Sequence, residues 1–162
     1  MRHLGGPAVI IGQSISGGAA TIAAATAPDL ITGAVELAPG TRSQSFDLGG
    51  LVRVKRYRAG CVQLAQVIVR GRVSNWKKYL DLAYPVKAAD WTAELARIEA
   101  KLSEPGWMRA LQAMFRASPG DAGAQLANVA GPVLVIEGSL DPDWADPRRG
   151  REDHRPPARR PR

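Results

Sequence analysis

A short apolar run followed at once by a turn of small residues is the feature that most constrains this chain. Residues 7–11 are apolar and partly β-branched, and glycines bound them on both sides, which is typical of a buried strand. Residues 15–27 are small and alanine-rich and stop at Pro28, which predicts a tightly packed helix. A second apolar run covers residues 30–37. The order strand, helix, strand predicts a βαβ unit with parallel strands.

The rest of the chain extends this pattern to an α/β fold. Residues 51–127 show apolar residues at helical spacing, and residues 133–137 form a third apolar run that predicts another strand of the same parallel sheet. Of the 162 residues, 45% are hydrophobic and 23% are charged, which excludes a mostly disordered chain. A single cysteine, Cys61, excludes an intramolecular disulfide. No apolar run is long enough for a transmembrane helix, so we expect a cytoplasmic protein without membrane contact.

The net charge of +7 is concentrated at the end of the chain. Residues 148–162 contain seven arginines against two acidic residues, together with several prolines, and they have no apolar periodicity. This composition predicts a disordered tail. Such a tail can bind polyanions by charge alone, but it contains no aromatic residue for base stacking, so nucleic acid is not the expected partner.

A serine lies in the turn between the first strand and the first helix. Ser14 has the small residues Gly12 and Ser16 two positions before and after it, which allows strand and helix to approach closely. The backbone N–H of Ile15 points into the same space and can hold a developing oxyanion. A phosphate-binding turn and a purely structural turn are the alternatives, although the P-loop lysine and the GxGxxG spacing are missing.

An acidic loop follows the last predicted strand. Asp141 and Asp143 flank Pro142, and an acid just beyond a strand end can orient a histidine that activates a serine. Asp-Pro is also common in plain turns, so a structural turn is the alternative interpretation. The basic residues Lys55, Arg56 and Arg58 are interpreted as a solvent-facing side of a helix. No cysteine and histidine spacing typical of a metal site is present, and no cofactor is expected.

Two segments resemble the α/β-hydrolase family. Residues 4–18 are similar to its nucleophile-elbow segment, and residues 132–142 are similar to the strand and loop that carry its triad acid. The resemblance implies a partial α/β-hydrolase domain over residues 1–147, with a helical cap insertion at about residues 42–127 and the tail at 148–162. It implies Ser14 as nucleophile, Ile15 as oxyanion-hole donor and Asp141 as triad acid, with Asp143 and Asp146 as poorer matches. The implied substrate is a small molecule with an ester or related acyl bond.

The sequence also departs from that family, and the departures predict weak activity. Members have several strands before the elbow, and one of their loops donates a second oxyanion hydrogen bond. They also have a strand after the acid that carries the triad histidine. Here the histidines are His3, which precedes the elbow, and His154, which lies in the arginine-rich tail without a strand before it. We therefore expect an impaired hydrolase, or alternatively an inactive remnant that acts through protein contacts, or polyanion binding by the tail.

Overall fold

The computed structural model describes residues 5–41 and 47–149 and divides them into two compact units. We call them the sheet unit, residues 5–41, 118–139 and 146–149, and the helical unit, residues 47–117 and 140–145. The elements, in chain order, are β1 (Ala8–Gln13), α1 (Ile15–Thr26), β2 (Ile31–Leu37), α2 (Leu48–Arg53), α3 (Lys55–Arg70), α4 (Val73–Ala83), α5 (Trp91–Ser103), α6 (Trp107–Met114), α7 (Gly120–Gln125), the 3-10 turn η2 (Leu126–Asn128) and β3 (Val133–Ile136).

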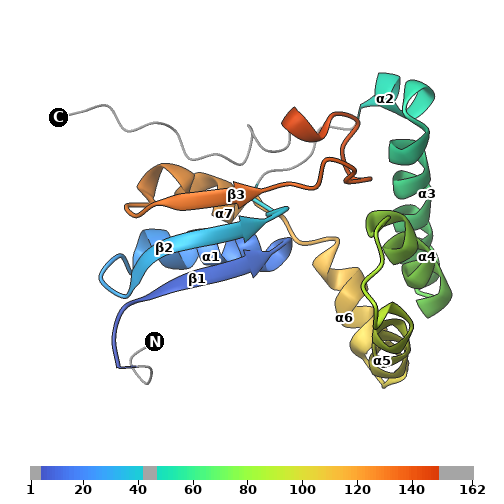
Figure 1. The fold of residues 1–162 in the computed structure, drawn as a ribbon, viewed down its shortest axis with the longest axis horizontal. Helices are drawn as coiled ribbons and strands as arrows, with labels where there is room; N and C mark the ends of the chain where they lie inside the picture. The colour runs from blue at the N-terminus through green and yellow to red at the C-terminus, as the bar shows by residue number, and fades with distance from the viewer. Residues whose placement is uncertain (1–4, 42–46, 150–162) are drawn as a thin grey trace. The chain divides into compact units, whose positions relative to one another are not determined.

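Three parallel strands form the sheet in the order β1-β2-β3 (Figure 1). In the register, Ala34 of the central strand pairs with Ile10 on one side and with Val133 on the other. The predicted mixed α/β class and the parallel pairing of the three apolar runs are confirmed. The helical spacing of residues 51–127 is also confirmed as a series of helices.

One face of this sheet packs against α1. Small side chains make the contact close: Ala24 of α1 and Ala34 of β2 are buried in one core with Ile31 and Val129. Helix α7 contacts α1, and Ala122 of α7 is buried. In Figure 1 both helices lie on the same side of the sheet. The Ala-rich composition of α1 therefore serves close packing on the strands, as the sequence predicted.

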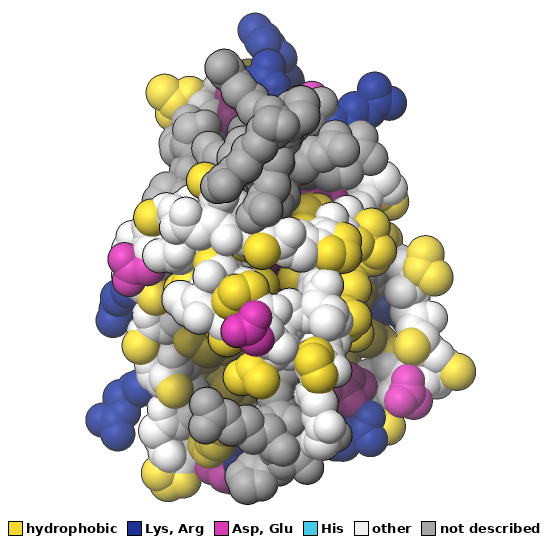
Figure 2. Space-filling view, turned by 90° about the vertical axis from the view of Figure 1, so that its left-hand side faces the viewer, with side chains coloured by type: hydrophobic (Ala, Val, Ile, Leu, Met, Phe, Trp, Pro, Cys, Tyr) yellow, Lys and Arg dark blue, Asp and Glu magenta, His cyan; other side chains and the backbone are white. Residues whose placement is uncertain are grey.

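The opposite face of the sheet is apolar and exposed. Val9 and Ile11 of β1 are 56% and 67% exposed, and Leu134 and Ile136 of β3 are 56% and 45% exposed. No helix of the described sheet unit covers these side chains. In a view toward the starts of the strands, hydrophobic side chains gather near the middle (Figure 2). A parallel sheet with apolar residues on both faces is typical of a strand layer that is buried on both sides.

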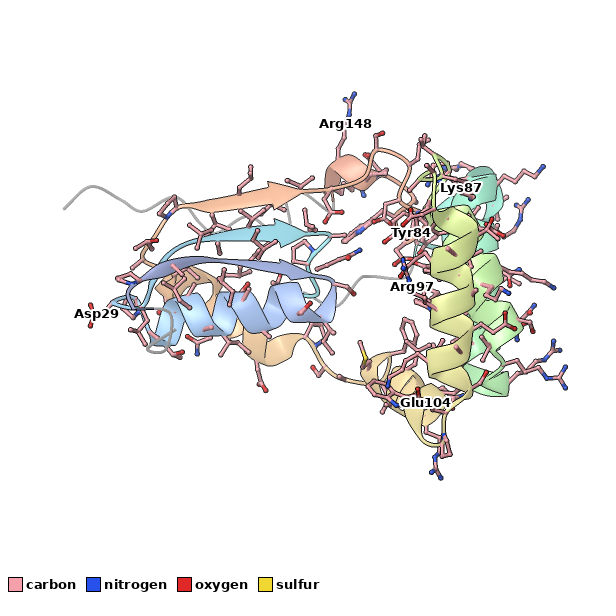
Figure 3. The ribbon with its side chains drawn as sticks, turned by 60° about the horizontal axis from the view of Figure 1, so that its bottom comes forward. Asp29, Tyr84, Lys87, Arg97, Glu104 and Arg148 are labelled. Carbon is pink, nitrogen blue, oxygen red and sulfur yellow. The ribbon has the colours of Figure 1, made fainter. Side chains whose placement is uncertain are left out.

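Helices packed in chain order form the helical unit. Helix α3 packs on α4, α4 on α5, and α5 on α6. The buried side chains include Tyr57 and Val67 of α3 and Tyr79 and Leu80 of α4. Charged side chains project from these helices and from the loops between them, and Figure 3 labels Arg97 of α5 together with Lys87 and Glu104 of the adjoining segments. Within the described residues, no helix combines the length and the apolar character needed to cross a membrane.

Candidate active site

Strand β1 and helix α1 approach each other so closely at their junction that two glycines have no room for a side chain. A Cβ atom on Gly12 would lie 2.2 Å from the backbone oxygen of Ser16. A Cβ atom on Gly18 would lie 2.5 Å from the backbone oxygen of Gly40. Both distances are far below van der Waals contact, so the turn requires glycine at these positions. The predicted sharp strand-to-helix turn is confirmed.

The backbone of Ser14 at this turn is strained. Its φ is 52° and its ψ is −124°, and within the described residues Ala38 is the other non-glycine residue with positive φ. A side chain at such angles costs about 1–3 kcal/mol and persists only where its surroundings fix it. Strain of this kind concentrates at functional sites, so Ser14 is the first candidate for a reacting group in the chain.

Backbone hydrogen bonds hold Ser14 in this conformation. Its carbonyl oxygen accepts from the N–H groups of Gly17 at 2.9 Å, Gly18 at 3.3 Å and Gly40 at 2.7 Å. Its own N–H donates to the carbonyl oxygen of Leu37 at 2.9 Å. The serine is thus tied to its own helix, to the end of β2 and to the loop after β2. These contacts offset the strain and leave the side chain to project from a fixed base.

Ser16, which stands where the family pattern has glycine, fits the turn through its hydroxyl. Its Oγ donates to the carbonyl oxygen of Gln13 at 2.6 Å and accepts from the N–H of Gln13 at 3.2 Å. The side chain folds back on the end of β1 instead of entering the space between strand and helix. The departure from glycine therefore does not disturb the turn.

The side chain of Ser14 is exposed, and Ile15 follows it as the first residue of α1. Within the described part of the chain, the Ser14 hydroxyl has no hydrogen-bond partner. As the first helical residue, Ile15 has a backbone N–H without an acceptor inside the helix. The first turn of α1 contains no acidic residue that would compete for this N–H. The helix dipole adds positive potential at the same point.

The predicted acid, Asp141, belongs to the helical unit. Its carboxylate accepts the backbone N–H of Asp143 at 2.8 Å, and its backbone oxygen accepts Nη2 of Arg56 at 2.6 Å. Burial raises the pKa of Asp141, although the hydrogen bond from Asp143 and the nearby Arg56 charge oppose this effect. The interpretation of residues 141–143 as a tight turn is thus confirmed in part, because the carboxylate closes that turn.

Asp143 is held more firmly than Asp141. The hydroxyl of Tyr79 donates to its carboxylate, at 2.9 Å from Oδ1 and 3.0 Å from Oδ2. Burial and the neighbouring Asp141 charge raise the pKa of Asp143 to about 6, and the Tyr79 hydrogen bond and Arg56 only partly offset them. The loop 140–145 therefore places two coupled carboxyl groups against the helices. Sequence reasoning missed Tyr79 because it lies in an apolar stripe of α4.

The solvent-facing interpretation of the basic residues at the start of α3 is wrong for Arg56. Lys55 and Arg58 are exposed, but Arg56 is half-buried against the loop 140–145. A Cβ atom on Gly60, one turn further along α3, would lie 2.6 Å from the backbone oxygen of Pro142. Arg56 and Gly60 are four residues apart and therefore lie on the same side of α3, which is the side that contacts the loop 140–145. This spacing is the signal in the sequence for that contact.

The structure assigns the predicted site residues to both units. Ser14 and Ile15 belong to the sheet unit and Asp141 belongs to the helical unit. That Ser14 and Asp141 share one cleft stays a prediction. His3, His154 and tail residues 150–162 lie outside the described residues. Residues 5–41 and 47–149 contain no group of three or more histidine, cysteine, aspartate or glutamate side chains that could hold a metal ion.

Over residues 5–41 and 47–149, the architecture is that of the α/β class with a three-stranded parallel sheet. Comparison of the sequence with models of known protein families found no match, and comparison with curated proteins also found none. The function proposed below is therefore argued from the site itself.

Proposed function

We propose that this chain is a serine hydrolase of the α/β-hydrolase type that acts on an ester or a related acyl bond. The strained backbone of Ser14, at a strand-to-helix turn that Gly12 makes possible, carries the proposal. A serine at such a turn exposes its hydroxyl at the carboxyl end of a parallel strand, where ligands of α/β proteins bind. Neither a phosphate-binding turn nor a plain loop requires a non-glycine residue at positive φ in this place.

The proposed reaction begins with attack of Ser14 Oγ on the carbonyl carbon of the substrate. The new C–O bond makes a tetrahedral intermediate, and the Ile15 N–H donates to its oxyanion. The ester C–O bond then breaks, and the alcohol leaves with the proton that Ser14 Oγ gave up, so that an acyl-serine remains. Water hydrolyses the acyl-serine, which releases the acid and restores the Ser14 hydroxyl. Asp141 is proposed to orient a general base.

The general base decides how fast this reaction runs. A serine hydroxyl that keeps its proton is a weak nucleophile, and no histidine lies within residues 5–41 and 47–149. Known triads that lose one member keep about 10³–10⁴-fold catalysis over water. We therefore expect slow ester turnover that depends on Ser14.

An active-site test compares three variants with the wild-type chain. Turnover of a p-nitrophenyl ester and covalent labelling by a fluorophosphonate are measured for each of them. We expect Ser14→Ala to abolish both signals, and Ser74→Ala, which removes an exposed serine on α4, to leave them unchanged. Ser14→Gly is expected to be inactive and also about 1–2 kcal/mol more stable, because glycine accepts the positive φ without strain. Full turnover in Ser14→Ala would contradict the proposal.

A second candidate is a hydrolase-fold protein that acts through contacts with other proteins. The exposed apolar face of the sheet, with Val9, Ile11, Leu134 and Ile136, favours this alternative. It predicts no labelling of Ser14 at any pH. It also predicts that the double substitution Ile11→Lys and Ile136→Lys removes self-association or partner binding without unfolding the sheet.

A further inference from the structure

A carboxyl group is buried in the sheet unit behind the turn that carries Ser14. Glu36 of the central strand β2 is 1% exposed, and Thr21 of α1 is 0% exposed. In the register, Glu36 lies between Gly12 of β1 and Val135 of β3. Because paired residues of neighbouring strands point to the same face, Glu36 shares the α1 face of the sheet with Gly12. Gly12 has no side chain and lies two residues before Ser14, so Glu36 is the side chain that this pair of residues places next to the Ser14 turn.

The Thr21 hydroxyl contacts two oxygen atoms that can act as acceptors, but it has only one proton to donate. Thr21 Oγ1 lies 3.2 Å from the carbonyl oxygen of Gly17, and it also contacts Oε1 of Glu36. Both Gly17 O and an ionised Glu36 would only accept, while a hydroxyl donates one proton. A protonated Glu36 removes this conflict, because its O–H donates to Thr21 and the Thr21 O–H donates to Gly17.

Among the described residues of the sheet unit, no basic side chain from the elements packed around Glu36 balances its charge. Its Oε2 is buried without a hydrogen-bond partner among the described residues. The elements β1, α1, β3 and η2 contain no ionisable side chain, and the charged residues that α7 and the end of β3 add, exposed Asp121 and half-buried Glu137, are both acidic. An unpaired buried carboxylate is among the most costly groups in a protein interior. Burial accordingly raises the pKa of Glu36, with a smaller opposing effect from Thr21.

We propose that Glu36 is a positioning residue, a neutral carboxylic acid whose proton closes the hydrogen-bond chain from Glu36 through Thr21 and Gly17 to Ser14. The last link is the Gly17 N–H, which donates to the Ser14 carbonyl oxygen at 2.9 Å. The chain ties β2 to the first turns of α1 and so fixes the base from which Ser14 projects. When Glu36 ionises, Thr21 turns its proton toward the carboxylate and releases Gly17. The catalytic consequence rests on the proposed function, while the protonation state does not.

The protonation state is tested by nuclear magnetic resonance of the glutamate carboxyl carbons in the whole chain. We expect one carboxyl to stay protonated at pH 7, and we expect its resonance to disappear in Glu36→Gln. Should Glu36→Gln fail to fold, Thr21→Val assigns the same resonance, because it removes the hydroxyl that contacts Glu36. If every glutamate of the wild-type chain titrates in the ordinary acidic range, the proposal is overturned.

A second measurement follows stability against pH. Glu36 has a raised pKa in the folded state, so its contribution to stability is complete below its unfolded pKa and is lost as pH rises through the folded pKa. We expect the folding equilibrium constant of the sheet unit to fall by about tenfold per pH unit between these two values. Glu36→Gln should abolish this slope, and Asp121→Asn, at an exposed acid of the same unit, should keep it. An unchanged slope in Glu36→Gln would refute the assignment.

The positioning role is tested by the pH profile of Ser14 labelling. Fluorophosphonate labelling of the wild-type chain should lose rate over the pH range in which Glu36 ionises, and Glu36→Gln should retain its rate there. Identical profiles would refute the positioning role. If Ser14 is not labelled in either chain, the proposed hydrolase function fails instead, and the carboxyl resonance and the stability slope still decide the state of Glu36.

Discussion

The sheet unit and the helical unit are built on different chemistry. The strands and helices of the sheet unit contain two ionisable side chains, Glu36 and Asp121. Five ion pairs that join two described residues lie in the helical unit. The sheet unit gains its stability from close packing of small residues. At Gly12 and Gly18 a single added Cβ atom would overlap a neighbouring backbone atom. The helical unit combines an apolar stripe on each helix with a charged outer surface, which tolerates change.

The two units also differ in the surroundings of their buried carboxyl groups. In the sheet unit, Glu36 has one hydroxyl for a partner and no neighbouring cation. In the helical unit, Asp143 has the Tyr79 hydroxyl, a second carboxyl and the charge of Arg56 nearby. Burial is the main cause of the raised carboxyl pKa in both units, and in the helical unit the neighbouring Asp141 charge adds to it. Four variants test the comparison.

The largest effect is expected from Gly12→Val in the sheet unit. A side chain at this position meets the backbone of α1 at 2.2 Å, and neither backbone can move without breaking the turn. We expect a loss of more than about 4 kcal/mol, enough to unfold the sheet unit. Hydrogen exchange of peptides from β1 and β2 measures this loss of stability. Gly6→Ala, where no atom lies within 4 Å of the added carbon, is the control and should leave the stability of the sheet unit unchanged.

Gly60→Val tests the corresponding contact in the helical unit. The added side chain meets the backbone oxygen of Pro142 at 2.6 Å and should push the loop 140–145 off α3. Because a loop can yield where a sheet cannot, we expect a smaller loss of about 2–3 kcal/mol. Hydrogen exchange should rise in the loop and around Tyr79. Ala65→Val, at an exposed position of the same helix, controls for the β-branched residue, and an equal effect there would exclude loop displacement as the cause.

Asp143→Asn should change the pH dependence of the helical unit. The pKa of Asp143 is raised to about 6 from 3.8, so the folded state binds its proton more tightly than the unfolded state does. Stability is therefore highest below about pH 4 and falls as pH rises to about 6. We expect Asp143→Asn to remove this fall and to gain about 1–2 kcal/mol at pH 7, since the amide oxygen still accepts from Tyr79. Hydrogen exchange of α4 at pH 5 and pH 7 measures the difference.

The opposite result for Asp143→Asn would be informative. A destabilised variant at pH 7 would mean that the charge of Asp143 is needed, with Arg56 as its partner. The cost of burying the Asp143 charge would then be smaller than the attraction of Arg56.

The smallest effect is expected from the surface charges. Lys77 and Glu99 form an ion pair at 2.6 Å, with side chains 32% and 53% exposed. Exposed pairs contribute about 0.2–1 kcal/mol and are screened by salt. We expect Lys77→Met to lose no more than this, and the loss should vanish in 1 M salt. Lys78→Met, at a neighbouring exposed lysine with no ion pair among the described residues, is the control for chemical denaturation.

The local features of the fold could be predicted from the sequence. The expected strands at residues 7–11, 30–37 and 133–137 are observed as Ala8–Gln13, Ile31–Leu37 and Val133–Ile136. Glycine and proline bound these runs, so their ends are set by neighbouring residues. The strained turn at Ser14 was also predictable, because the small residues that it needs lie within four positions of it.

The contacts between distant residues could not be predicted. Arg56 meets Asp141 across 85 positions, and Tyr79 meets Asp143 across 64. The roles of Tyr79 and Glu36 could not be predicted from the sequence, and the reasons were opposite. Tyr79 fits an apolar helical stripe and so gives no sign of its hydroxyl partner. Glu36 is a charged residue within an apolar strand, and only the position of Thr21 on α1 shows why it is tolerated there.

The place of the helical unit in the chain has a consequence for how this protein can vary. The chain leaves the sheet after β2 and returns to it at β3, with most of the helical unit between them. The entropy lost in closing such an excursion grows only with the logarithm of its length, and doubling the length costs about 0.6 kcal/mol. Residues 47–117, which lie in the helical unit, can thus be lengthened, shortened or exchanged at little expense to the folding of the strands. The turn around Ser14 has no such freedom, so sequence drift is expected to accumulate in the excursion and to spare the turn.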